Sequence, residues 1–91
     1  MIFHENALVD LIRSRVGGGE GELLGRYAIA PGAAGLNTGF SMAGVVRLMP
    51  GCSIGNHTHM ADEEIYYIIS GEGEYTDHDG TVHRVYAGDW T

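Results

Sequence analysis

The stretch Gly51-Cys-Ser-Ile-Gly-Asn-His-Thr-His-Met-Ala-Asp-Glu-Glu-Ile-Tyr-Tyr-Ile-Ile-Ser-Gly-Glu-Gly73 places two histidines and a carboxylate between glycines. Residues i and i+2 of a β-strand point to the same face, so His57 and His59 can present both imidazoles to one point. The β-branched and aromatic run 64–69 favours a second strand. Antiparallel pairing of the two strands across a turn at 60–63 would set a carboxylate beside the imidazoles. Two neutral nitrogens and one carboxylate suit a divalent metal ion.

The charge balance excludes two classes of partner. The 91-residue chain has twelve carboxylates against five basic residues, all of them arginine, and its formal net charge is −7. A nucleic acid or an anionic membrane would need a basic surface, so we expect neither as a partner. No apolar run approaches the ~20 residues of a membrane span. The amino terminus also lacks the basic and then apolar pattern of a signal peptide.

Cys52 is the single cysteine of the chain. One cysteine cannot form an internal disulfide, which suits a reducing compartment and excludes a site built from several thiolates. We therefore expect a cytoplasmic protein, and we interpret Cys52 as a small residue of a turn or strand.

Short strand-like runs separated by turn residues predict an all-β fold. Pro31-Gly32 and Pro50-Gly51 are turn signals, and Asp79-Gly80 is a hairpin cue between two strand-like runs. Residues 5–16 fit either a short helix or a strand. The predicted strands are 22–30, 40–49, 54–59, 64–69, 72–76 and 81–86. Six or more short strands with frequent turns indicate a sandwich or a barrel, formed here by a single domain that spans 1–91.

The spacing around the histidines resembles the first conserved motif of the cupin superfamily, G(X)5HXH(X)3,4E(X)6G. Its fixed positions are occupied in register by Gly51, His57, His59, Glu64 and Gly71. The resemblance implies a cupin-type β-barrel or jelly roll (a double-stranded β-helix). It also implies a divalent transition metal bound inside the barrel by His57, His59 and Glu64.

The motif decides between two adjacent glutamates that metal chemistry alone does not separate. Glu64 has the six-residue gap to Gly71 that the motif requires, whereas Glu63 does not. Strand parity agrees, because Glu64 shares a face with Tyr66 and Glu63 lies opposite.

The second cupin motif, G(X)5PXG(X)2H(X)3N, supplies a histidine as fourth ligand, and Gly88-Asp89-Trp90-Thr91 is similar to its beginning. A start at Gly80 instead would put Tyr86 at the proline and Thr91 at the histidine, so we prefer the first frame. We expect the polypeptide to continue beyond Thr91, which makes the domain C-terminally incomplete as given. The alternative is an open barrel with three ligands.

The resemblance implies a metal-dependent enzyme that acts on a small-molecule substrate. A nitrogen and oxygen donor set suits Fe, Mn, Ni, Co, Zn or Cu without choosing among them. Three protein ligands leave positions for water, dioxygen or a bidentate substrate, as dioxygenase, decarboxylase, isomerase or lyase chemistry requires. The alternatives are a metal-binding or small-ligand-binding module or sensor without turnover, and a structural β-barrel.

Tyr66 is the candidate catalytic residue, because it lies two residues from Glu64 on the same predicted face. Its hydroxyl would line the pocket and orient the substrate, and the alternative is an aromatic residue of the barrel core. The opposite face of the same strand carries apolar side chains, which predicts a homodimer. These outer positions are Ile65, Tyr67 and Ile69.

Five further residues are predicted to lie in the pocket, in the core or on the surface. Phe40 and Met42 would face inward if their strand has the expected register, either as a pocket wall or as ordinary core. Arg47 has the opposite parity, so we expect it to be exposed rather than to clamp an anionic substrate. His78 in its turn should be solvated, and the face that His83 occupies stays open.

Overall fold

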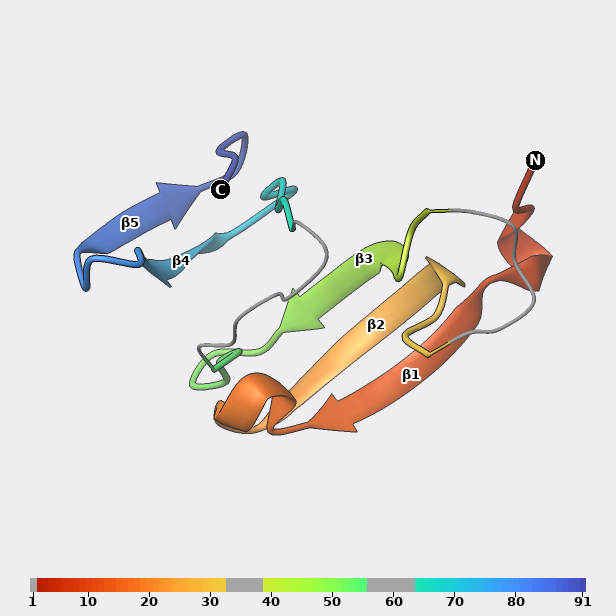
Figure 1. The fold of residues 1–91 in the computed structure, drawn as a ribbon, viewed down its shortest axis with the longest axis horizontal. Coiled ribbons are helices and arrows are strands. Elements are labelled where there is room, and N and C mark those ends of the chain that lie inside the picture. Colours follow the sequence, from red (N-terminus) through yellow and green to blue (C-terminus); the bar gives the residue numbers. More distant parts are fainter. Residues whose placement is uncertain (1, 33–38, 56–63) are drawn as a thin grey trace. The chain divides into compact units, whose positions relative to one another are not determined.

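The structure is a computed structural model that describes residues 2–32, 39–55 and 64–91. Every strand pairing is antiparallel, and the described residues contain no α-helix, so the predicted all-β cupin-type fold is confirmed. The elements are η1 (Glu5–Ala7), β1 (Val9–Ser14), η2 (Val16–Gly18), β2 (Glu22–Ile29), β3 (Ala43–Leu48), β4 (Glu72–Thr76) and β5 (Val82–Tyr86), of which η1 and η2 are 3-10 helices (Figure 1).

The chain divides into two compact units, Met1–Thr58 and His59–Thr91. The first contains a sheet of order β1-β2-β3, and the second contains the β4-β5 hairpin. The assignment of 1–91 to one domain stays a prediction.

The central strand β2 decides which face of its sheet is buried. Side chains alternate along a strand, and the exposure of β2 alternates in step from Glu22 to Tyr27. Leu23, Tyr27 and Ile29 form the core, at 3%, 0% and 6% exposure. The register places Leu11 and Val46 opposite Gly25, so their side chains share this buried face. The other side, the exposed face, carries Asp10, Ile12, Leu24, Arg26, Val45 and Arg47.

The ambiguity over residues 5–16 is resolved in favour of a strand. Antiparallel pairing joins Val9 to Tyr27 and Ser14 to Glu22, and η1 occupies only three residues before the strand. The predicted strands at 22–30, 72–76 and 81–86 are confirmed with bounds shifted by at most one residue.

The strand predicted at 40–49 is shorter than expected. It begins at Ala43, and Phe40 and Met42 precede it with 69% and 37% exposure. Their prediction as inward-facing residues is therefore wrong, because they lie outside the paired ladder that would fix their direction. Ile54 and Gly55, predicted to begin a strand, lie in no strand, and 56–59 fall outside the described residues.

The β4-β5 hairpin forms where the Asp-Gly cue predicted it. The Asp77 N–H donates to the Thr81 carbonyl at 2.8 Å, and the Gly80 N–H donates to the Asp77 carbonyl at 2.9 Å. Gly80 has φ +85, a conformation that favours glycine.

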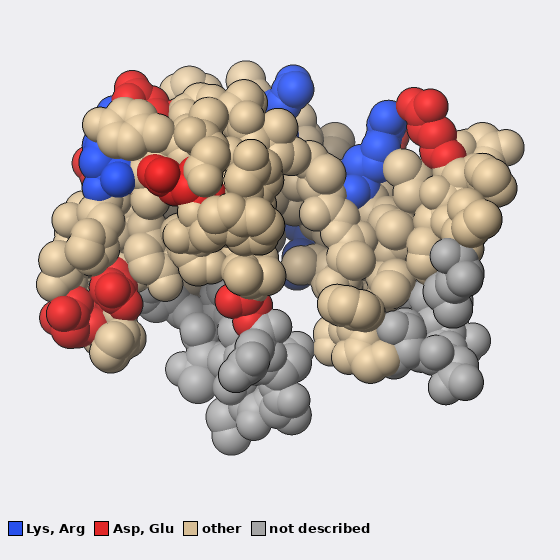
Figure 2. All heavy atoms as spheres, turned by 90° about the horizontal axis from the view of Figure 1, so that it is seen from above, with Lys and Arg blue, Asp and Glu red and all other residues tan. Residues whose placement is uncertain are grey.

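The charged side chains of the described residues form small groups on the face drawn in Figure 2. On the face drawn in Figure 2 these groups are separated by uncharged surface, and the described residues form no continuous basic patch there. No helix among the described residues is long and apolar enough to cross a membrane.

Candidate metal centre

Of the three predicted metal ligands, Glu64 lies in the described part of the chain. His57, His59 and the competing Glu63 fall outside the described residues. Glu64 is half-buried and begins a run in which exposure alternates, so that Glu64, Tyr66 and Ile68 are half-buried. The residues between them, Ile65, Tyr67 and Ile69, are 71%, 50% and 63% exposed. This alternation agrees with a shared face for Glu64 and Tyr66, whose roles stay predictions.

The segment 64–69 is held by the last residues of the chain. Tyr66 exchanges both backbone hydrogen bonds with Thr91, at 3.2 and 2.9 Å. Ile68 donates to the Asp89 carbonyl at 2.9 Å and accepts from the Gly88 N–H at 2.8 Å. Between these hydrogen-bonded residues, an antiparallel bridge joins Tyr67 to Trp90. The centroids of their two rings are 4.6 Å apart.

This pairing revises the predicted strand at 64–69. Its described partner is 88–91, the stretch similar to the second motif, and the full ladder of a regular strand does not form. Antiparallel strands direct successive backbone groups to opposite edges, so the N–H groups of Ile65 and Tyr67 point away from this partner. The pairing predicted with 54–59 lies outside the described residues from 56 onward.

Residues 52–55, shortly before His57, are hydrogen-bonded to the turn between β1 and β2. The Gly55 N–H donates to the Val16 carbonyl, and the Ser53 N–H donates to the Glu20 carbonyl, both at 2.8 Å. The Ser53 hydroxyl accepts from the Glu20 N–H at 2.9 Å. We call this set of contacts between residues 52–55 and residues 16–21 the clasp. It fixes the backbone two residues before the first predicted ligand.

Two glycines allow the clasp to close. A Cβ on Gly55 would overlap the Gly17 carbonyl, and a Cβ on Gly19 would overlap the Ser53 carbonyl. Cys52 lies beside Gly21, and a Cβ on Gly21 would overlap the Cys52 sulfur. Cys52 is thus a packed, half-buried free thiol after a turn. These contacts join segments that lie far apart in the chain.

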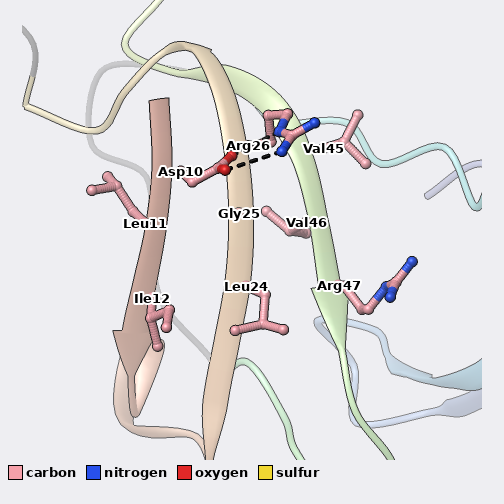
Figure 3. Close-up of a pocket in the computed structure, with 9 residues that line it drawn as sticks. All are labelled: Asp10, Leu11, Ile12, Leu24, Gly25, Arg26, Val45, Val46 and Arg47. Atoms are coloured by element: carbon pink, nitrogen blue, oxygen red, sulfur yellow. Dashed lines mark hydrogen bonds and ion pairs between the residues drawn. The ribbon is translucent and has the colours of Figure 1, made fainter. Parts of the chain in front are cut away.

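The exposed face of the first sheet carries a groove that the sequence did not predict (Figure 3). Arg26 makes a bidentate ion pair with Asp10, at 2.7 and 3.0 Å. These hydrogen bonds from Arg26 lower the pKa of the Asp10 carboxyl. Arg47 is exposed, as predicted, and extends from β3 at the groove's margin. The groove measures about 610 Å³ and is lined by Asp10, Leu11, Ile12, Leu24, Gly25, Arg26, Val45, Val46 and Arg47.

In the hairpin, the Asp77 carboxylate lies close to two histidines. The His78 N–H donates to one oxygen of this carboxylate at 2.8 Å, and the His83 ring nitrogen lies 3.6 Å from the other oxygen. His78 is exposed, as predicted, and His83 is half-exposed. Arg84 on β5 lies 3.1 Å from Glu72 and 3.7 Å from Glu74, so the charges of this strand face are paired.

The pKa of Asp77 is lowered from its ordinary value of 3.8, first by the His78 N–H and then by the His78 side chain. A carboxyl group whose pKa is lowered by folding stabilises the protein at pH values above its pKa in the unfolded chain. This stabilisation is lost as the pH falls through the pKa of the group in the folded protein. We therefore expect the stability difference between wild type and Asp77→Ala to be small, constant above pH ~5 and to vanish in more acidic solution. Thermal unfolding of both proteins between pH 2 and 7 measures it. A difference that grows on acidification would contradict the expectation.

The donor set fits a metal ion by its chemistry, since imidazole and carboxylate are both ligands of divalent first-row metals. Among residues 2–32, 39–55 and 64–91, no group of three or more His, Cys, Asp or Glu side chains is arranged to hold a metal ion. Two of the three predicted ligands lie outside these ranges.

Comparison with known proteins identifies relatives of this chain. Residues 44–90 match the family model described as cupin domain. A protein of Thermotoga maritima named oxalate-binding protein is 34% identical over 76 residues, which are 84% of this chain and 60% of that protein. The chain thus spans less than two thirds of this relative's length. No solved structure matches the chain significantly.

Proposed function

This chain belongs to the cupin domain family, and on that premise we propose that it binds a divalent transition metal through His57, His59 and Glu64. The observation that carries the proposal is the first motif, whose five fixed positions are all occupied within the matched residues 44–90. The half-buried position of Glu64 supports it, because a partly desolvated carboxylate gains from a cation.

We propose a small carboxylic acid as the ligand. The support is the oxalate-binding relative, which is similar over most of this chain. A dicarboxylate also matches the donor set, because three protein ligands leave open positions that two carboxylate oxygens can occupy. Bound metal would supply a Lewis acid that polarises the carboxylate. The chain's own residues would orient it, with Tyr66 on the same side of its strand as Glu64.

Turnover of the bound acid is the second candidate function. The half-buried position of Tyr66, two residues from Glu64, favours it by offering a hydroxyl for orienting substrate or transferring a proton. The reaction would be of the dioxygenase, decarboxylase, isomerase or lyase type. Oxygen uptake or loss of oxalate with metal-loaded protein would separate an enzyme from a binding module.

We also propose a cytoplasmic homodimer. A single free cysteine suits a reducing compartment. The exposed side chains of Ile65, Tyr67, Ile69 and Trp90 provide an apolar surface for a second copy to cover.

Metal analysis of the purified protein tests the proposal. We expect about one bound divalent ion per wild-type chain. His57→Ala and Glu64→Gln should each weaken metal binding by about 100-fold or more, because each changes a residue that binds the metal directly. Loss of a residue that only hydrogen-bonds to a metal ligand already weakens binding by about 10- to 100-fold. Metal content and titration with Mn²⁺ or Zn²⁺ would measure it.

Glu63→Gln is the matched control for Glu64→Gln, and His78→Ala is the control for His57→Ala. Both controls should retain the metal, since Glu63 lies outside the motif register and His78 pairs with Asp77 in the hairpin. Unchanged metal content in His57→Ala would show that the motif holds no metal in this chain.

A further inference from the structure

The tip of the β4-β5 hairpin contains a pair of residues with a covalent reactivity of its own. Asp79 is the one aspartate of the chain that is followed by glycine, and both Asp79 and Gly80 are exposed. A backbone nitrogen can attack the side-chain carboxyl of the preceding aspartate and close a cyclic imide, a succinimide. A side chain on the residue that carries this nitrogen hinders the approach, and glycine has none. The Asp79-Gly80 bond is therefore the least hindered aspartyl bond of the chain.

The Asp79 side chain is folded back over the peptide bond that joins it to Gly80. Its Oδ1 atom accepts a hydrogen bond from the Thr81 N–H, two residues further along the chain, at 2.8 Å. An aspartate that bonds in this way closes a turn around the intervening peptide. The carboxyl group of Asp79 and the nitrogen of Gly80 thus belong to the same small turn.

The hydrogen bonds of the folded turn oppose ring closure. The Gly80 N–H donates to the Asp77 carbonyl at 2.9 Å, and the Asp77 N–H donates to the Thr81 carbonyl at 2.8 Å. The attacking nitrogen has to give up its proton, and the Asp79 carboxyl has to leave the Thr81 N–H and turn toward this nitrogen. Both changes require a local opening of the turn. The folded hairpin therefore delays the reaction.

The other aspartates that the structure describes precede residues with larger side chains. Their bonds are Asp10-Leu11, Asp77-His78 and Asp89-Trp90. The Asp10 carboxylate also accepts from the Arg26 guanidinium at 2.7 Å. The Asp89 carboxylate accepts from the Tyr86 N–H at 2.7 Å. Each of these three aspartates has a hindered nitrogen beside it, so ring closure is easiest at Asp79.

We propose that Asp79 is a modification site at which aspartate converts to isoaspartate, and that the folded turn slows this conversion. The Gly80 nitrogen attacks Cγ of Asp79, a C–N bond forms, and the carboxyl OH and the amide proton leave as water. Water then adds to the imide at the original backbone carbonyl, and the bond from that carbonyl to nitrogen breaks. The backbone now runs through Cβ and Cγ, and the former carbonyl is a free carboxylate. One water leaves and one enters, so no further reactant is needed.

The product lengthens the backbone of the turn by one carbon atom. Turn type and loop length fix the register of a hairpin, so the bonds between Asp77 and Thr81 no longer fit. A hairpin of two strands is marginally stable by itself, and β4 and β5 pair with each other in this way. The chain continues from β5 into 88–91, which holds Tyr66 and Ile68 by backbone hydrogen bonds. Isomerisation therefore loosens the hairpin from its tip.

Peptide mapping of the full chain after warm storage at neutral pH tests the site. Isoaspartate should appear first at position 79, and heavy-oxygen water should label it, because hydrolysis of the imide adds an oxygen from solvent. Conversion should be about 10-fold faster or more in urea-unfolded protein, the factor that loss of two ordinary hydrogen bonds gives. Asp79→Glu is the matched control. It keeps the carboxylate, but the larger ring closes slowly, so no isomer should form there.

Three results would contradict the proposal. Isoaspartate that appears first at Asp10, Asp77 or Asp89 would overturn the assignment of the site. Equal rates in the folded and the unfolded chain would overturn the protective role of the turn. Hydrogen exchange of the separated isomer supplies the third result: the amide protons of Asp77 and Gly80 should exchange faster than in the unmodified chain, and unchanged exchange would overturn the effect on the hairpin. The reaction uses neither metal nor ligand, so its failure leaves the proposed function intact.

Discussion

Gly55→Ala is expected to lower the free energy of unfolding by about 3 kcal/mol, the upper range for an overpacked site. The added methyl group would overlap the backbone carbonyl of Gly17, and no side-chain rotation relieves an overlap with backbone. One of the two segments must move away. That movement breaks the bond from the Gly55 N–H to Val16 and strains the bonds of Ser53 with Glu20.

Urea unfolding followed by circular dichroism measures this loss. Gly73→Ala is the control, because nothing lies within 4 Å of the position of its added Cβ. We expect that variant to stay within about 0.5 kcal/mol of wild type, as surface substitutions usually do. Gly19→Ala should repeat the effect of Gly55→Ala, since its Cβ meets Ser53 across the same clasp. Wild-type stability in both clasp variants would show that the two segments do not approach so closely in solution.

A consequence for the metal site follows from the same contact. Gly55 lies two residues before His57, so a displaced clasp changes where the ligand-bearing segment starts. The clasp glycines are not fixed positions of the first motif. Their role therefore comes from the approach of two distant backbone segments, which a local pattern does not reveal.

The predictable parts of the fold were those set by neighbouring residues. The strand predicted at 22–30 corresponds to β2, and Asp79-Gly80 identified the hairpin, because strand propensity and turn conformation are local properties. Residues 5–16 stayed ambiguous until pairing with β2 was known, since their spacing fits both a helix and a strand.

The sequence predicts the residue types of the candidate site, and these stay predictions, whereas the surroundings of the site depend on tertiary contacts. The motif selected Glu64, and the half-buried positions of Glu64 and Tyr66 agree with the parity on which that choice rested. The pairing of 64–69 with 88–91 depends on contacts between distant segments. No spacing rule predicts such contacts.

Leu23→Ala is expected to cost about 2–5 kcal/mol of folding free energy, the usual range for a buried leucine. Leu23 is 3% exposed and lies on the buried face of the central strand. The first sheet has three strongly buried core side chains among the described residues, so neighbours have few ways to refill the space. A cavity that cannot collapse is at the costly end of that range.

The adjacent leucine provides a matched control in the same strand. Leu24 points to the exposed face, lines the groove and is 37% exposed, so Leu24→Ala should cost about 1 kcal/mol. The two variants have the same change in side chain and nearly the same change in strand propensity. Their difference in urea midpoint therefore measures burial alone. Equal losses in the two variants would mean that the exposed face is covered in solution, as a second copy seated on the groove would cover it.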